Sequence, residues 1–362
     1  MKQQHFWAAL FIYIIAVFYL ASTTPISPHE AKILYGSQEI SATLMQWGKE
    51  AVDGFLGLRL FSIFFGMLSV GLFYQVSRNY LNKKEDAYLA TFIFICLPGI
   101  LTAMSLANSA IIVLPIVLLF VLWYEKGYFI ALIPLMLGLF FIHQTSIIFF
   151  VALFLYALMN KDKKLAVLSA SFLIAFLYLA KGIAIGGRPS GHFIEIFGLY
   201  ATIFSPLLFL YFFYVMYRIL LRERKTLLWY ISFTALAFSL LLSVRQRVSI
   251  ADFAPYVMIA VVVMLHAYNN SIRVRLPQFQ KYYRRGFYVV MALLIVNTLL
   301  IVFHKALFYS MDDPSKHFAY RIYKPYLLAQ TLKKQKLNCY DSQQQREGYQ
   351  LRYYGISSCS KK

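Results

Sequence analysis

Charged residues are scarce in this 362-residue sequence, and cysteine is almost absent. Only 14% of the residues are Asp, Glu, Lys or Arg, whereas 60% are hydrophobic and 18% are aromatic. Soluble globular chains carry about 25% charged residues, so this composition excludes an ordinary soluble protein and predicts an integral membrane protein. Three cysteines exclude a disulfide scaffold and a structural zinc site of four cysteines.

Acidic residues are scarcer than basic ones. The chain has 15 Asp and Glu residues against 35 Lys and Arg residues, which gives a net charge of +20. The basic residues form short clusters between apolar runs and no continuous basic face, so nucleic acid is not the expected partner. The predicted partner of this charge is the cytoplasmic surface of a membrane, that is, its lipids.

Eleven apolar runs of about 13 to 22 residues recur along the chain, each bounded by charges or turn residues. These runs are 6–21, 55–76, 87–104, 111–124, 128–141, 146–158, 165–180, 200–220, 227–244, 253–267 and 287–303. They predict an all-α polytopic membrane protein with about 11 transmembrane helices. The chain has no linker, repeat or low-complexity segment, and composition shifts only near His304. We therefore expect a transmembrane domain at 1–304 and a polar tail at 305–362.

The positions of Lys and Arg predict the orientation of these spans. With the N-terminus inside, seventeen basic residues fall on the cytoplasmic side and seven on the other side before the tail. The positive-inside rule therefore predicts a multi-pass protein of the cytoplasmic (inner) membrane with its N-terminus inside and its C-terminal tail outside. We interpret the first run as an uncleaved anchor, although Ala21-Ser22-Thr23 would suit a signal-peptide cleavage site.

The apolar runs lack ionisable residues in their central parts, and Arg59 and Arg218 lie near span ends. Ion-coupled transporters keep ionisable groups near the bilayer midplane, because their relays require them. This absence argues against coupled transport.

The first outer loop, 22–54, contains a strong helix-start signal. Ser27 suits an N-cap, Pro28 suits the first helical position, and Glu30 lies where a capping box places its carboxylate. Downstream, four apolar residues share one helical face: Ile33, Ile40, Leu44 and Trp47. The pattern predicts one amphipathic helix in the outer membrane interface. Glu30 is then either a helix cap or a general base at headgroup depth, and His29 is either a solvated neighbour or a ligand.

A second set of polar residues lies at the predicted outer ends of later spans. Its members are Asn108, His143, Gln144, Lys181, Arg188, His192, Glu195, Arg245 and Arg247. Each alone suits an interfacial anchor or a cap. Together they place positive charge at the predicted depth of Glu30, as a phosphate-bearing lipid requires.

In the order of its motifs, the chain resembles the C-type membrane glycosyltransferases, nearest to the protein O-mannosyltransferase and lipid A aminoarabinose transferase branches. The matching stretches are His29-Glu30-Ala31-Lys32-Ile33-Leu34-Tyr35, Gly57-Leu58-Arg59-Leu60-Phe61-Ser62, Leu106-Ala107-Asn108-Ser109-Ala110, His143-Gln144-Thr145 and Arg245-Gln246-Arg247. They span most of residues 1–300. The resemblance implies an enzyme that moves a sugar from a polyprenyl-phosphate donor to a lipid, glycan or protein acceptor on the outer face of the membrane.

The resemblance also implies roles for individual residues. The catalytic acidic pair of the family maps to His29-Glu30, where the family commonly has Asp-Glu, so Glu30 or His29 would act as the base, or the protein is inactive. Of these alternatives, Glu30 is the predicted base. Arg245, Arg247, Lys181 and His143 would contact the phosphate. A second acidic residue of the family is replaced by Asn108 or Ser109, so a divalent metal ion is not supported, and no cofactor is expected.

The tail is predicted to be a small α+β unit. Residues 320–336 read as a basic amphipathic helix, and 337–340 and 350–356 read as short strands. An outer tail would lie in an oxidising compartment, so Cys339 and Cys359 are candidates for a disulfide.

Two other functions remain open on the sequence. One is a flippase or transporter of lipid-linked sugars, which would also need outer cations. The other is an inactive relative that serves as an assembly partner, which the departures at His29 and Asn108 would allow.

Overall fold

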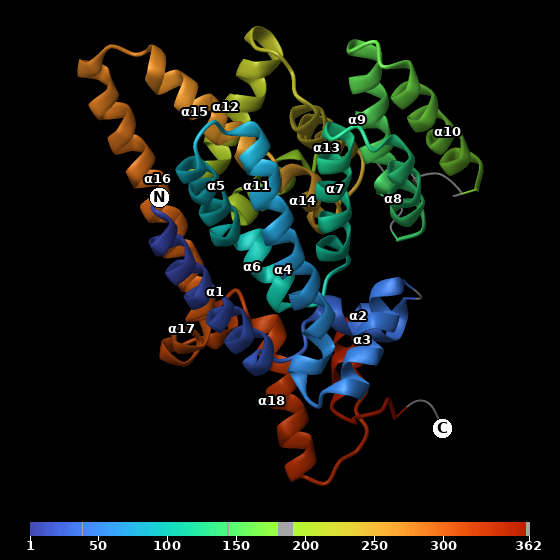
Figure 1. Ribbon diagram of the computed structural model, residues 1–362. Coiled ribbons are helices and arrows are strands. Elements are labelled where there is room, and N and C mark those ends of the chain that lie inside the picture. Colours follow the sequence, from blue (N-terminus) through green and yellow to red (C-terminus); the bar gives the residue numbers. More distant parts are fainter. Residues whose placement is uncertain (38, 143–144, 180–190, 360–362) are drawn as a thin grey trace. The chain divides into compact units, whose positions relative to one another are not determined.

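A computed structural model describes residues 1–37, 39–142, 145–179 and 191–359 (Figure 1). These residues form nineteen α-helices and one 3-10 helix, and they contain no β-strand. The helices up to residue 159 are α1 Gln3–Thr23, α2 Pro28–Gly36, α3 Ile40–Ala51, α4 Phe55–Tyr80, α5 Lys84–Cys96, α6 Pro98–Ser105, α7 Ser109–Glu125, α8 Phe129–Ile142 and α9 Ser146–Met159. The later ones are α10 Lys163–Leu179, α11 Phe193–Phe204, α12 Pro206–Arg222, α13 Leu227–Ser243, α14 Ile250–Met258, α15 Val261–Val274, α16 Pro277–Val302, α17 His304–Ser310, η1 Pro314–Lys316, α18 Tyr320–Lys334 and α19 Gln345–Tyr353.

Every predicted apolar run is helical where it is described, but three runs are broken. By length and composition, α1, α4 and α16 are each able to cross a membrane. The bent pairs α5–α6, α11–α12 and α14–α15 would raise that number to six, and four further apolar helices are shorter. The fold is therefore that of a multi-pass membrane protein, and the count of eleven spans stays a prediction.

Proline causes two of the breaks that the apolar pattern concealed. Proline disfavours the helical conformation of the residue before it, and Leu97, which precedes Pro98, is extended at φ −61° and ψ 127°. The α5–α6 pair bends there by 61°. Ser205 precedes Pro206 at φ 84° and ψ 139°, and the α11–α12 pair bends by 109°. The predicted runs 87–104 and 200–220 are therefore each two helices joined at a bend.

The chain divides into two compact units. The first comprises residues 1–11, 66–101 and 109–298, and the second comprises 12–65, 102–108 and 299–362. In the first unit, α9 packs against α10 and α13, and α14 packs against α7 and α13. Its core is built of large apolar side chains such as Trp229, Phe149 and Phe94, each almost completely buried. The predicted boundary at residue 304 stays a prediction.

The second unit joins the first outer loop to the tail. The loop forms two short helices, α2 and α3, in place of the single amphipathic helix predicted. Ile33 is buried, whereas Trp47 is 58% exposed, so the four apolar residues do not share one face. Helix α19 packs against α2, and Gln350 Nε2 donates to the carbonyl oxygen of Ile26 at 2.8 Å.

The tail itself is helical. Helix α18 confirms the helix predicted from residue 320, but the predicted strand at 350–356 is wrong, because α19 occupies most of it. Leu351 of α19 packs with Ala329 and Leu332 of α18. Ala329 and Leu332 are three residues apart, which is the spacing of one helical face and not the alternation of a strand.

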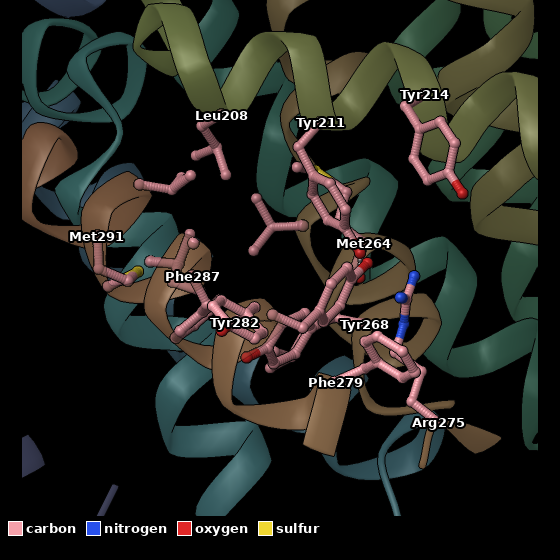
Figure 2. Close-up of a pocket in the computed structure, with 16 residues that line it drawn as sticks. Leu208, Tyr211, Tyr214, Met264, Tyr268, Arg275, Phe279, Tyr282, Phe287 and Met291 are labelled. Atoms are coloured by element: carbon pink, nitrogen blue, oxygen red, sulfur yellow. Dashed lines mark hydrogen bonds between the residues drawn. The ribbon is translucent and has the colours of Figure 1, made fainter. Parts of the chain in front are cut away.

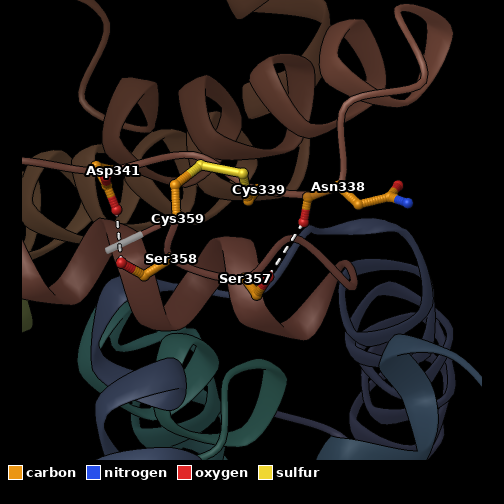
Figure 3. Close-up of a disulfide and its surroundings, with 6 residues drawn as sticks. All are labelled: Asn338, Cys339, Asp341, Ser357, Ser358 and Cys359. Carbon is orange, nitrogen blue, oxygen red and sulfur yellow. Dashed lines mark hydrogen bonds between the residues drawn. A yellow bond between two sulfur atoms is a disulfide. The ribbon is translucent and has the colours of Figure 1, made fainter. Parts of the chain in front are cut away.

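A disulfide closes the tail. Cys339 and Cys359 are bonded, with their Cα atoms 5.0 Å apart (Figure 3). The backbone beside the bond forms one isolated parallel bridge between Cys339 and Ser357, where the other predicted strand, 337–340, was expected. Ser357 N donates to the carbonyl oxygen of Asn338 at 3.0 Å. The candidate disulfide between Cys339 and Cys359 is therefore present. In place of the two predicted strands, the tail has a single isolated bridge.

Two glycines allow a close backbone approach between α3 and α4. A Cβ atom on Gly57 would collide with the carbonyl oxygen of Val52, and one on Gly48 would collide with the carbonyl oxygen of Gly57. Backbone cannot move aside as a flexible side chain can, so these contacts require glycine at both positions.

We expect Gly57→Ala to destabilise the protein by about 1–3 kcal/mol, the usual cost of overpacking. Thermal unfolding of the detergent-solubilised protein measures this change. Gly71→Ala on the same helix is the control, since a Cβ there meets no atom within 4 Å. Equal melting temperatures for the two variants would contradict the assignment.

Candidate functional site

The N-terminus of α2 is held by a complete capping box. Ser27 Oγ accepts a hydrogen bond from Glu30 N at 3.2 Å, and Ser27 N donates to Glu30 Oε2 at 2.8 Å. Pro28 occupies the first turn. This confirms the helix start predicted from the sequence, and it places the Glu30 carboxylate beside the end of α1.

Arg59, near the start of α4, forms a forked ion pair with Glu30. Its Nε lies 2.7 Å from Glu30 Oε1, and its Nη2 lies 2.9 Å from Glu30 Oε2. Both side chains are fully buried. A bidentate pair of this kind is the strongest geometry available to an arginine and a carboxylate.

The remaining donors of Arg59 bind backbone carbonyls at the end of α1. Nη1 donates to Ala21 O at 2.9 Å and to Thr24 O at 2.8 Å, and Nη2 donates to Pro25 O at 3.0 Å. A guanidinium has five N–H donors, and all five are used here. The helix-terminal carbonyl of Ala21, which has no partner within the helix, is thereby satisfied.

The turn between α6 and α7 completes the environment of Glu30. Ala107 N donates to Glu30 Oε1 at 2.8 Å. With Ser27 N and the two Arg59 nitrogens, the carboxylate accepts four hydrogen bonds. Three of the sequence motifs, 29–35, 57–62 and 106–110, therefore meet at one carboxylate.

These contacts determine the ionisation of Glu30. Burial alone raises the pKa of this carboxyl, but the Arg59 charge and the hydrogen bonds from Arg59, Ser27 and Ala107 outweigh it and lower the pKa below the ordinary value of 4.5. A carboxylate with a lowered pKa and no vacant lone pair is a poor acceptor for a substrate proton. The geometry favours a structural role for Glu30, and its role as base stays a prediction.

The neighbours of Glu30 differ from it in exposure. His29 is exposed, and Asn108 in the adjoining turn is half-buried. Both belong to the same compact unit as Glu30 and Arg59. Of these two residues, each of which stands where the family commonly has an acidic one, His29 is therefore the more exposed.

The predicted phosphate contacts lie in the other unit. Arg245 and Arg247 follow α13, and both are exposed. Arg247 Nε lies 3.2 Å from Glu195 Oε2, and His192 Nδ1 lies 3.0 Å from the same oxygen. Lys181 and His143 fall outside the described residues. Among the residues that are described, no group of three or more His, Cys, Asp or Glu side chains could hold a metal ion.

Sequence reasoning missed the partnership of Arg59 with Glu30. It noted Arg59 as a cation near a span end, as part of the stretch 57–62 and as a polar site candidate, but not as the partner of Glu30, although a lone Arg entering an apolar helix needs a carboxylate or carbonyls to be buried. Glu30 lies 29 residues away, and the contact of Ala107 with it crosses 77 residues. No local spacing links these positions.

The fold resembles that of ArnT from Cupriavidus metallidurans. The crystal structure of ArnT bound to undecaprenyl phosphate matches with a TM-score of 0.60 and 10% sequence identity, covering 97% of this chain and 85% of that one. The apo ArnT structure matches with a TM-score of 0.54 and 13% identity, covering 98% of this chain and 75% of that one. The expected C-type glycosyltransferase resemblance is thus confirmed at the level of fold.

Sequence comparison alone does not reach this result. No protein-family model matches the chain, and no curated protein matches it. At identities this low, structures retain a shared arrangement of helices while individual functional residues change, so the likeness establishes the fold and leaves the chemistry to be argued from the site.

We expect Glu30→Gln to destabilise the protein by about 3–5 kcal/mol, because it leaves the buried guanidinium of Arg59 without a counter-charge. Thermal unfolding in detergent at neutral pH measures the effect. Glu50→Gln on α3 is the control, since Glu50 is exposed and forms no salt bridge among the described residues. An unchanged melting temperature for Glu30→Gln would show that the ion pair does not stabilise the protein.

The same carboxylate predicts an acid-dependent loss of stability. The pKa of Glu30 is lower in the folded protein than its ordinary value of 4.5, so its contribution is complete above about pH 4.5 and is lost as the pH falls through the folded pKa. The difference in melting temperature between the wild type and Glu30→Gln should therefore shrink below about pH 4.5. A difference that stays constant down to the acid limit would contradict this linkage.

Proposed function

We propose that this protein is a membrane glycosyltransferase that moves a sugar from a polyprenyl-phosphate donor to an acceptor on the outer face of the cytoplasmic membrane. The observation that carries the proposal is the fold likeness to ArnT over almost the whole chain, since one of the matching ArnT structures is bound to undecaprenyl phosphate. The donor would be an isoprenoid phosphate carrying a hexose or pentose. The acceptor would be a lipid, a glycan or a protein.

The proposed reaction is a displacement at the anomeric carbon of the donor sugar. The acceptor oxygen forms a bond to that carbon as the bond between the carbon and the lipid phosphate oxygen breaks. The acceptor proton passes to a base, and polyprenyl phosphate leaves with the added negative charge. Cations near the phosphate stabilise that charge.

Arg245 and Arg247 are the proposed phosphate contacts, together with Lys181 and His143. Arg247 supports this role, since it is 75% exposed and its partner Glu195 is itself 43% exposed. An exposed pair of this kind contributes about 0–1 kcal/mol, so a phosphate can displace the carboxylate at little cost.

His29 is the proposed base, and Glu30 is the proposed positioning residue. The imidazole of His29 is exposed at the start of α2, whereas the Glu30 carboxylate is fully enclosed by its four donors. Histidine exchanges protons near neutral pH, which suits it to accept a hydroxyl proton. In this arrangement Glu30 and Arg59 fix the helix that carries His29.

The inactive assembly partner stays a second candidate. Two observations favour it: the family's acidic residue is replaced at His29, and the adjacent Glu30 is saturated with hydrogen bonds. A flippase is a third outcome of the same experiment, because it would also bind a lipid-linked sugar without cleaving it.

The expected result is release of free polyprenyl phosphate when purified protein in liposomes is given a polyprenyl-phosphate-linked sugar and an acceptor extract. His29→Gln should slow release by about 10²-fold or more, as loss of a general base does. His5→Gln is the matched control, because His5 is also exposed. Intact donor in every sample would support the scaffold, and intact donor moved between leaflets would support the flippase.

A further inference from the structure

A cavity of about 560 Å³ lies in the first compact unit, among α12, α15 and α16. Figure 2 shows Leu208 and Met291 on one side of it, and Tyr214 and Arg275 on the other. Its volume falls in the range of pockets that hold small molecules, about 300–1,000 Å³.

The lining changes in the same direction along all three helices. On α12 it passes from Leu208 to Tyr214, and on α15 from Val261 to Tyr268. Helix α16 runs the opposite way and passes from Tyr282 to Met291. On each helix, the side chains that line the cavity are therefore mainly aliphatic far from the connection between α15 and α16 and mainly aromatic near it. Such a gradient is typical of side chains that meet the membrane–water interface, where tyrosine is enriched.

Arg275, in that connection, is the one charged residue among those that line the cavity. Its guanidinium carbon lies 4.3 Å from the centroid of the Tyr283 ring, and its side chain is exposed. By contrast, the nearby Arg218 of α12 is paired with Glu223 at 2.8 Å and donates to Ser271 Oγ. Arg275 forms no salt bridge within the described residues.

The positive charge beside the cavity has no counter-charge within its own segment of the chain. Five cations lie between the last turn of α15 and the start of α16: Arg273, Arg275, Lys281, Arg284 and Arg285. No Asp or Glu occurs in the sequence between Asp252 and Asp312. The anion that would balance this cluster must come from outside the segment.

We propose that the cavity binds an anionic glycerophospholipid, with an acyl chain among the aliphatic residues and the phosphate at Arg275. The gradient requires a ligand that is apolar at one end and anionic at the other, and the cation cluster adds attraction for a net negative headgroup. The segment 273–285 is predicted to face the cytoplasm, and anionic lipids are present in the inner leaflet. Binding is independent of sugar transfer, since it uses none of the residues placed in that reaction.

Two variants test the site by different means. Arg275→Gln removes the headgroup contact. Gly286→Trp fills the cavity, because Gly286 lines it and a Cβ there meets no atom within 4 Å. Their controls are Arg224→Gln, an exposed cation in the α12–α13 connection, and Gly71→Trp, a glycine with equally open surroundings.

The full chain is exchanged into nanodiscs of phosphatidylglycerol and phosphatidylethanolamine and released, and the retained lipid is counted by native mass spectrometry. We expect phosphatidylglycerol to be enriched on the wild type and on both controls. Retention should fall by about fivefold in Arg275→Gln, the effect of one cation at a membrane surface. In Gly286→Trp it should be lost.

Three outcomes would overturn the proposal. These are equal retention of the two lipids, unchanged retention in Gly286→Trp, and displacement of phosphatidylglycerol by an equimolar polyprenyl phosphate. Thermal unfolding of each variant accompanies the count. If Gly286→Trp does not fold, Arg275→Gln decides, since it changes only an exposed side chain, and retention equal to that of Arg224→Gln would reject the site.

Discussion

The buried ion pair between Arg59 and Glu30 is the interaction on which the second compact unit depends. Seven hydrogen bonds hold it, two within the pair and five to backbone groups, so the five donors of the guanidinium and the four acceptor positions of the carboxylate are all occupied. Removing a charge from water is costly, and only such complete satisfaction makes the burial tolerable. The pair ties together the end of α1, the start of α2, the start of α4 and the turn after α6.

Much of the architecture could be predicted from the sequence. Apolar runs bounded by charge located the helices, and Ser27-Pro28-His29-Glu30 located the start of α2 with its capping box. The bends at Leu97 and Ser205 were missed because the runs continue through Pro98 and Pro206 without loss of hydrophobicity. The strand expected at 350–356 failed for a related reason. A short stretch with few apolar residues fits both periods, and packing of Leu351 against α18 decided for the helix.

The candidate site was less predictable than the fold. Sequence spacing identified Glu30 but could not tell a catalytic carboxylate from a buried one, because that distinction depends on Arg59 and Ala107, which are distant along the chain. Arg245 and Arg247 were identified by their charge and by their motif, and Glu195 was placed in the same outer cluster, but its ion pair with Arg247 was not predicted. Local patterns therefore located the ionisable groups, while long-range contacts determined what each group can do.

The second unit is assembled from three stretches, 12–65, 102–108 and 299–362, which implies an order of assembly. The Arg59–Glu30 pair lies within the earliest stretch and closes a short loop, so it can form while the ribosome is still making the rest of the chain. The backbone of Ile26, by contrast, waits for Gln350 and Tyr354 from the last stretch. Until that stretch emerges, the backbone N–H and C=O groups of Ile26 lack these two partners. The nascent loop would then be a target for chaperones and proteases during biogenesis.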